Sequence, residues 1–375
     1  MKSTSLNTLK RIFLPGIILQ SVLIGGGYAT GREIVEYGGK FGANGWLSGL
    51  AIFAGFSIMS ILSMEACRQW KVYDYKSLLK KMIGRGWIVY EAVYLSGSIL
   101  IIAVMAAAAG ELLHNTLGIN NWFGISIIII TVGFLNYKGD ETIAKLETLG
   151  TIALFITYFL FAASIFNTRG EAIAETFRQW NTSFTGTTAS VGVVLTTGIL
   201  YVGYNLGVYP ASFFTYRAIE TRRQSVAAGL LSGLLMTTPW FLTYFAMMAF
   251  YAEPEILQSA VPWLAMLQNF PPAYIILFSI VVGWTLIETA TGVIHGFIGR
   301  IDAEAQSKGR QLKKGHKALI SLTALIAALF LSQVGIIDLV AKGYTLLAYG
   351  LIAVYALPLL AYSPWLFKSN QVVGD

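Results

Sequence analysis

The chain has 375 residues, of which 55% are hydrophobic and 12% are charged. Its mean hydropathy is +0.64, and apolar runs near the ~20 residues needed to cross a bilayer recur along it. These features predict an all-α polytopic membrane protein. The formal net charge of +7 does not indicate a nucleic-acid partner, because the basic residues fall in alternate loops. One cysteine and three scattered histidines exclude an internal disulfide and argue against a structural metal site.

Hydropathy predicts ten membrane spans, and charge predicts their orientation. The spans cover residues 12–37, 44–66, 87–112, 121–137, 143–166, 189–214, 225–251, 272–298, 316–333 and 337–363. With the N-terminus inside, the outer loops carry only Lys40, Arg169 and Arg178, and the remaining loop Lys and Arg residues are cytoplasmic. This distribution follows the positive-inside rule. We therefore expect an integral membrane protein of a bacterial cytoplasmic membrane with both termini in the cytoplasm.

Two of the predicted spans are interrupted by glycine-rich segments. Gly25-Gly26-Gly27-Tyr28-Ala29-Thr30-Gly31 lies in the first span, and Gly203-Tyr204-Asn205-Leu206-Gly207 lies in the sixth. Glycine disfavours helix, and backbone groups freed within hydrocarbon need another partner, such as a bound solute. The alternative is that these glycines only allow close helix packing.

The two interrupted spans occupy matching places in two halves of five spans. Because five is an odd number, the second half must have inverted topology. The sequence thus predicts one transporter domain over residues 1–375, with inverted repeats at about 11–167 and 188–365. Discontinuous first and sixth helices in a 5+5 inverted repeat are the LeuT-type arrangement, in which solute binds at the breaks.

Two segments also resemble a known superfamily. The stretch from Gly25 through Arg32 to Glu36-Tyr37-Gly38-Gly39 resembles the first-helix signature of the neurotransmitter:sodium symporters and the wider amino acid-polyamine-organocation superfamily. Leu206-Gly207-Val208-Tyr209-Pro210, followed by Phe213-Phe214-Thr215-Tyr216, is similar to the unwound sixth helix of that group. More narrowly, residues 27–33 resemble the YkvI-type amino-acid permeases, which have this length and span count. The resemblance implies transport of an amino acid.

The chain departs from this superfamily at two places. Symporters with a first sodium site often place an asparagine shortly before the arginine, whereas Tyr28, Ala29, Thr30 and Gly31 precede Arg32 here. The third-helix tyrosine that holds a substrate carboxylate in some members has no counterpart in residues 106–110, although Tyr94 lies deeper on that helix. Backbone donors are then expected to hold the carboxylate.

Candidate substrate-binding residues flank the two breaks. Unpaired N–H groups at the start of the outer half-helix form a seat for a carboxylate, and the glycines allow close approach. Side chains of the sixth span could orient an amino group, although packing is an equal alternative for its tyrosines. The predicted set is Gly25, Gly26, Gly27, Tyr28, Thr30, Gly31, Tyr201, Tyr204 and Asn205.

Arg32 and Asp338 are the candidate outer gate. A charged residue at the depth of Arg32 costs roughly 2.5 to 3.5 kcal/mol unless water or a partner compensates it. Asp338, at the outer end of the tenth span, matches the acidic gate partner of similar transporters. The alternative is intrahelical pairing, because Arg32 with Glu36 and Asp338 with Lys342 are both i,i+4 pairs.

Glu288, Thr289 and Thr291 are the candidate ion-coupling residues of the eighth span, where similar symporters place ligands for a second sodium ion. An intramembrane carboxyl is a functional candidate by default. Glu288 could carry a proton, or a bound Na⁺ could keep it ionised. The alternative is a protonated structural residue. No other metal or cofactor is indicated.

The sequence therefore predicts a secondary active transporter, a cation-coupled symporter of an amino acid or similar small zwitterion that works by alternating access. Enzyme signatures are missing: the glycine run fits neither a dinucleotide fingerprint nor a P-loop, and no G-x-S-x-G elbow or H-E-x-x-H pair occurs. The rival hypothesis is a non-transporting membrane receptor for an amino-acid-like ligand on the same fold, which would bind solute without flux.

Overall fold

The computed structural model describes residues 2–138, 140–186 and 188–368, and every regular element in these ranges is a helix. Eight helices are long and apolar enough to cross a membrane. Two shorter apolar helices, Arg11–Leu23 and Asn121–Asn136, lie where the first and fourth spans are predicted. Together these ten helices occupy the ten predicted positions, so the predicted all-α membrane fold is confirmed.

The helices follow the chain in this order. The first half contains α1 (Lys2–Leu23), α2 (Gly26–Thr30), α3 (Arg32–Tyr37), η1 (Gly39–Asn44), α4 (Trp46–Trp70), α5 (Tyr75–Ile83), η2 (Gly84–Gly86), α6 (Trp87–Leu117), α7 (Asn121–Lys138) and α8 (Asp140–Arg178). After η3 (Ser183–Thr185), the second half contains α9 (Val191–Asn205), η4 (Leu206–Ala218), α10 (Arg222–Met248), α11 (Pro254–Gln258), α12 (Pro262–Leu267), α13 (Pro272–Ser307), α14 (Lys314–Leu331), η5 (Ser332–Val334), α15 (Ile336–Asp338), η6 (Leu339–Gly343), α16 (Tyr344–Leu351), η7 (Ile352–Ala356) and α17 (Leu357–Lys368).

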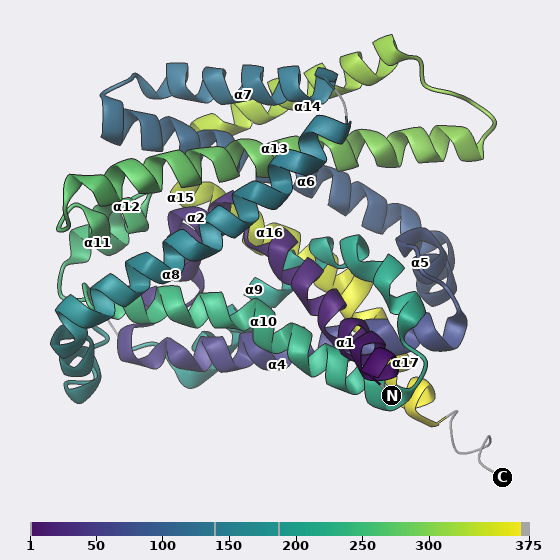
Figure 1. Cartoon of the computed structure of the whole chain (residues 1–375), viewed down its shortest axis with the longest axis horizontal. Coiled ribbons are helices and arrows are strands. Elements are labelled where there is room, and N and C mark those ends of the chain that lie inside the picture. The colour runs from purple at the N-terminus through teal and green to yellow at the C-terminus, as the bar shows by residue number, and fades with distance from the viewer. Residues whose placement is uncertain (1, 139, 187, 369–375) are drawn as a thin grey trace.

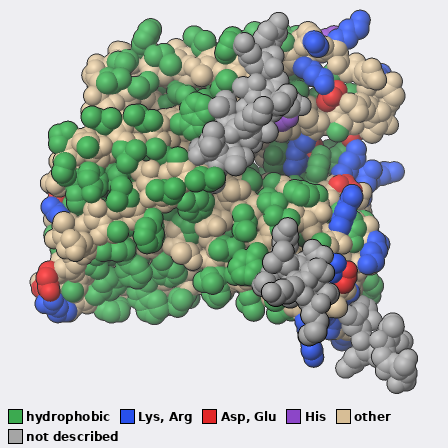
Figure 2. Space-filling view, viewed as in Figure 1, with side chains coloured by type: hydrophobic (Ala, Val, Ile, Leu, Met, Phe, Trp, Pro, Cys, Tyr) green, Lys and Arg blue, Asp and Glu red, His purple; other side chains and the backbone are tan. Residues whose placement is uncertain are grey.

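The long helices form two groups. Figure 1 shows α4, α9 and α10 on one side and α7, α13 and α14 on the other, with α1 and α16 between them. Contacts agree with this view: α10 packs against α4 and α1, α13 packs against α6, and α9 packs against α4 and α16. The first residues of α1 and the last residues of α17 lie at one end in Figure 1, and Figure 2 shows most of the visible Lys and Arg side chains gathered at that end.

Small residues let α4 and α10 approach closely. A Cβ atom added at Gly229 would lie 2.4 Å from Ile61 Cγ1 and 2.7 Å from the Ile61 nitrogen. One added at Gly233 would lie 2.1 Å from Ser57 Oγ. Backbones can pack this tightly only where no side chain intervenes, which is how membrane helices gain contact area without a hydrophobic driving force.

The first span is broken twice, and the predicted unwound run is shorter than expected. α1 ends at Leu23, and α2 occupies Gly26–Thr30, most of the predicted break. Gly31 then adopts φ 84°, a left-handed conformation that glycine permits, and α3 begins at Arg32. The backbone departs from helix at Ile24–Gly25 and at Gly31, with one short helical segment between these two points.

The sixth span changes its winding and does not unwind. α9 ends at Asn205, and η4 continues from Leu206 as a 3₁₀-helix that contains Pro210. Runs of 3₁₀-helix longer than three or four residues are uncommon, and a 3₁₀ stretch inside a longer helix often marks a hinge or strain. The tenth span contains two π-helical stretches, Leu339–Gly343 and Ile352–Ala356.

Candidate functional site

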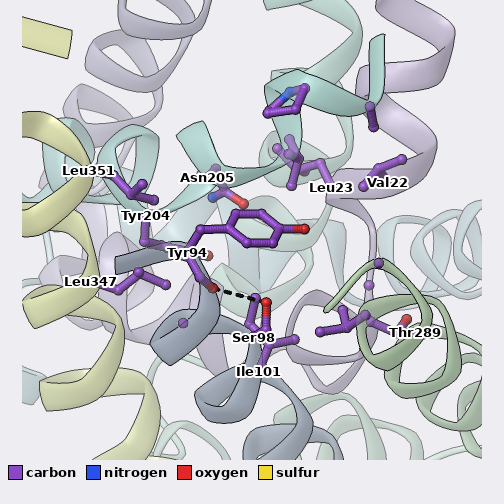
Figure 3. A pocket seen from close by; sticks show the side chains of 18 of the residues that line it. Val22, Leu23, Tyr94, Ser98, Ile101, Tyr204, Asn205, Thr289, Leu347 and Leu351 are labelled. Atoms are coloured by element: carbon purple, nitrogen blue, oxygen red, sulfur yellow. Dashed lines mark hydrogen bonds between the residues drawn. The ribbon is translucent and has the colours of Figure 1, made fainter. Parts of the chain in front are cut away.

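A cavity of about 480 Å³ lies where the interrupted first span meets the sixth. The first span contributes the end of α1, Gly25 and the start of α3 to its walls. The other walls come from α6, the α9–η4 junction, α13 and α16. In Figure 3, Leu347 and Leu351 lie on one side and Thr289 on the opposite side, while Ser98 donates to the Tyr94 carbonyl at 2.9 Å between them. Polar and charged lining residues are Glu33, Tyr75, Tyr94, Ser98, Tyr204, Asn205, Thr289, Arg300 and Tyr344.

Glu33 is an acidic side chain at the α3 end of this cavity. It lies in the first turn of α3, directly after the Gly31 break, and is 6% exposed. The Tyr204 hydroxyl donates to Glu33 Oε2 at 2.5 Å, which joins the first span to the sixth. The sequence prediction did not include Glu33. The signal was present, because a carboxyl within an apolar span is a functional candidate.

Tyrosine rings surround Glu33 and the α9 end of the cavity. Tyr204 stacks on Tyr344 with ring centroids 4.6 Å apart. Tyr37 and Tyr201 pack against Tyr204, each with centroids 5.4 Å from it. These rings fix the position of the Tyr204 hydroxyl and therefore the orientation of its hydrogen bond to Glu33.

Arg300 lies at the opposite, Lys/Arg-rich end of the cavity. Its guanidinium carbon lies 3.3 Å from the Tyr94 ring centroid and 3.8 Å from that of Tyr75. Arg300 Nη1 also donates to Glu91 Oε2 at 3.2 Å. The cavity thus extends from Glu33 to the end that carries both chain termini.

The predicted residues of the first break have different surroundings. Gly25 lines the cavity, and a Cβ atom there would lie 3.0 Å from Thr289 Cγ2. Tyr28 instead contacts α10, where its hydroxyl donates to the Pro239 carbonyl and lies 2.8 Å from Thr243 Oγ1. Gly26 and Gly27 are in α2 but outside the residues whose side-chain surroundings are described.

Backbone N–H groups at the start of α3, which were predicted to bind a carboxylate, already have acceptors within the protein. Thr30 Oγ1 accepts a hydrogen bond from the Arg32 backbone N–H at 3.2 Å. The Gly31 N–H donates to the Tyr28 carbonyl at 2.9 Å. Glu33, in the first turn, places a further negative charge at this helix end. This arrangement favours a cationic group of a solute near α3 over an anionic one.

The predicted residues of the sixth span divide in the same way. Tyr204 and Asn205 line the cavity, and Asn205 Nδ2 donates to the Tyr201 carbonyl at 2.8 Å. Tyr201 is fully buried against the rings of Tyr37 and Phe56. The structure therefore brings Gly25, Tyr204 and Asn205 together at the cavity, and places Tyr201 behind them.

The structure does not bring the predicted gate residues together. Arg32 is 5% exposed, and its Nη1 donates to the carbonyls of Leu257 in α11 at 2.7 Å and of Ser259, just after α11, at 3.2 Å; residues 254–267 are called the α11–α12 segment below. Its Nη2 lies 3.8 Å from Glu36 Oε2. Asp338 pairs with Lys342 at 2.9 Å, the i,i+4 alternative. Arg32 is therefore held by backbone carbonyls of the α11–α12 segment and by Glu36.

Of the predicted ion-coupling residues, Thr289 lines the cavity. Thr291 faces elsewhere: its hydroxyl donates to the Ile287 carbonyl at 2.7 Å, and its own carbonyl accepts from Asn136 Nδ2 of α7 at 3.4 Å. Glu288 is partly buried and is not among the lining residues. These three residues belong to one turn of α13, and of the three only Thr289 lines the cavity.

No protein-family model and no curated protein matches the chain. Solved structures do match. A Na⁺-coupled sialic acid symporter in a substrate-bound outward-open state is 12% identical, with 95% of this chain and 86% of that chain covered and a TM-score of 0.52. MhsT in complex with L-phenylalanine is 12% identical, with 94% and 88% covered and a TM-score of 0.62. A variant of the Eremococcus coleocola manganese transporter is 14% identical, with 92% and 77% covered and a TM-score of 0.50.

These likenesses establish the fold: the chain has the LeuT-type arrangement predicted from its interrupted helices. At 12 to 14% identity they carry no substrate to this chain. Its membership of the amino acid-polyamine-organocation superfamily, and of the YkvI-type permeases within it, stays a prediction.

Proposed function

We propose that the protein is a cation-coupled secondary active transporter of an amino acid or a similar small zwitterion. Solute binds in the cavity beside Gly25, Glu33, Tyr204 and Asn205. The observation that supports this most is the position of the cavity, at the point where both interrupted spans change their winding. In the LeuT-type arrangement such breaks supply free backbone groups to a solute near the bilayer midplane.

The chemistry of the cavity suits a zwitterion. The Glu33 carboxylate would take the ammonium group, because charge-assisted hydrogen bonds are about twice as strong as neutral ones. Hydroxyl groups of Thr289 and Tyr94, on the facing walls, would donate to a carboxylate. Apolar residues of α16, including Leu347 and Leu351, leave room for an uncharged side chain. MhsT was solved with an amino acid, which agrees with this substrate class.

The predicted repeats and gate are part of the same proposal. Residues of about 11–167 and 188–365 would form the two inverted repeats, and solute access would alternate as one helix group moves against the other. The outer barrier would consist of Arg32 bound to the α11–α12 segment. Thr289 is the best-placed of the proposed coupling residues, because it faces both Gly25 and the cavity.

Flux in proteoliposomes tests the proposal. The protein is reconstituted so that carriers inserted in the two orientations can be distinguished. Each of the twenty proteinogenic amino acids is then supplied in labelled form for counterflow. Sodium and pH gradients are varied separately. Accumulation of at least one amino acid, abolished in protein-free vesicles, is expected. Saturable binding without flux would favour the receptor hypothesis. The absence of both binding and flux would contradict the substrate class.

A further inference from the structure

We propose that Glu33 is the site at which a proton and the ammonium group of the solute exclude one another, so that solute is exchanged for a proton. This inference rests on the transport function proposed above and names its coupling ion. It also changes the direction of coupling from the symport that the family resemblance implies. The reasons are the position of Glu33 in the cavity, the partners of the cations around it and the cost of an uncompensated buried carboxylate.

Glu33 faces solute and is protected from bulk water. Its side chain lines the cavity but is only 6% exposed. Within the described part of the chain, its carboxylate accepts a hydrogen bond from the Tyr204 hydroxyl, a neutral donor 2.5 Å from Oε2. A neutral donor orients the carboxyl group without cancelling its charge, so the charge balance of the site depends on what else binds there.

The cations near α3 have other acceptors. Arg32 donates to the carbonyls of Leu257 and Ser259 and lies beside Glu36. Lys40 of η1 pairs with Glu36, and Lys342 of η6 pairs with Asp338. The remaining titratable groups on α3 and on the elements packed against Glu33 are Glu36, Tyr37, Tyr28, Tyr201, Tyr204, Tyr244, Tyr344, Tyr349 and, at the far end of α10, Arg222 and Arg223. None of the described cations is paired with Glu33.

A carboxylate removed from water without a positive partner is strongly disfavoured. Glu33 can be neutralised by a proton or by a bound ammonium group, and one carboxylate cannot hold both. When the ammonium binds, the O–H bond of the Glu33 carboxyl breaks and its proton passes to water on that side of the membrane. When the solute leaves on the other side, the carboxylate takes a proton from that side and the carrier returns. No electron transfer is involved.

Infrared difference spectroscopy of the reconstituted protein tests the exclusion directly. The C=O stretching band of protonated carboxyl groups is recorded at fixed, mildly acidic pH in sodium-free buffer. The probes are methylammonium chloride and an equimolar mixture of the twenty proteinogenic amino acids. Both are expected to reduce the band and to release one proton per carrier. Glu33→Gln should remove this response, whereas Glu36→Gln, a matched change of an ion-paired residue one turn further along α3, should retain it.

Three results would overturn the proposal. The first is a probe-induced decrease of the carboxyl band that is the same in Glu33→Gln as in the wild-type protein. The others are a decrease that requires added NaCl and a decrease without proton release. If Glu33→Gln does not fold, Tyr204→Phe replaces it. That variant lacks only the hydroxyl that orients the Glu33 carboxyl, so the methylammonium concentration that gives half the response should rise about tenfold. An unchanged concentration would count against the site.

Flux separates failure of this inference from failure of the proposed function. Exchange predicts that vesicles with an acidic lumen accumulate labelled amino acids, whereas symport with a proton predicts accumulation driven by acid outside. Accumulation driven by acid outside would contradict the exchange and leave the transport function intact. Absence of flux under every gradient would contradict the transport function, and the infrared response would still decide whether Glu33 binds protons and ammonium groups in competition.

Discussion

Under the proposed function, Arg32 is the residue expected to close one face of the cavity. Its guanidinium donates to two carbonyls of the α11–α12 segment, and both hydrogen bonds are buried or partly buried. We expect Arg32→Ala to reduce initial amino-acid counterflow in proteoliposomes at least tenfold. Hydrogen bonds to charged groups contribute about 1.5 to 3 kcal/mol each, so their loss would strongly destabilise the outward-closed state that the cycle requires.

Asp338→Asn is the matched control for this gate. Asp338 is half exposed and pairs with Lys342 within its own helix, so its neutralisation should change counterflow by less than about twofold. A double exchange, Arg32→Asp with Asp338→Arg, should not restore activity. Restored activity in the double variant would instead show that the two residues pair in another state of the cycle.

Thr289 and Thr291 provide a second comparison at the residue scale. Thr289 faces the cavity and Gly25, whereas the Thr291 hydroxyl is used within α13. Thr289→Val should lower the initial counterflow rate about fivefold, because a lost neutral hydrogen bond is worth about 0.5 to 1.5 kcal/mol. Thr291→Val should leave the rate near the wild-type value. Equal effects of the two substitutions would contradict the assignment of Thr289 to the site.

At the scale of elements, the contact between α4 and α10 depends on glycine. A Cβ atom at Gly229 would overlap the backbone and side chain of Ile61, so one of the two helices must shift. Gly229→Ala should destabilise the folded protein by about 1 to 3 kcal/mol, the usual cost of overpacking. The measurement is the midpoint of thermal unfolding in detergent, which should fall.

Gly299→Ala on α13 is the control for this change, because nothing lies within 4 Å of the added Cβ atom. Its midpoint should equal or exceed that of the wild-type protein, since alanine has the higher helix propensity. If Gly229→Ala were as stable as Gly299→Ala, the two helices could not be packed as closely as the structure shows.

The breaks illustrate what the sequence could predict about these elements. The glycines located the interruption of the first span, because only backbone freedom was needed to infer it. They did not predict that α2 would form inside the run. The Tyr28 hydroxyl donates to α10 and the Tyr158 hydroxyl donates to the Ala29 carbonyl, and helix propensity cannot predict such tertiary hydrogen bonds. In the sixth span, the glycines likewise did not predict that the helix would continue as a 3₁₀-helix after Asn205.

The candidate site was predicted less completely, because it depends on which faces of the helices meet. Asn205 and Tyr204 were predicted to bind substrate, and both line the cavity at the α9–η4 junction. Glu33 was overlooked, although its carboxyl lies in the first predicted span. The partners of Arg32 could not be predicted either, because backbone carbonyls leave no signal in side-chain chemistry.

At the scale of the whole molecule, one end of the cavity is closed and the other is reached from the Lys/Arg-rich end. Arg32 and the buried Trp263 lie on the closed side, while Tyr75, Arg300 and Ala303 line the cavity toward the chain termini. The positive-inside rule predicts that this end is cytoplasmic, so we expect the arrangement to be inward-facing. The conformation itself was not predictable from the sequence, because all states of a transport cycle share one sequence.

Sided labelling of a single cysteine tests the central claim, that one cavity serves both faces of the membrane in turn. Cys67 is buried and is replaced by alanine, and Val293, on the cavity wall in α13, is replaced by cysteine. A membrane-impermeant maleimide is applied to either face of sealed vesicles. Without solute, labelling from the cytoplasmic face alone is expected, and the mixture of twenty amino acids should permit labelling from both faces. Labelling from neither face, or from the outer face alone without solute, would contradict the account.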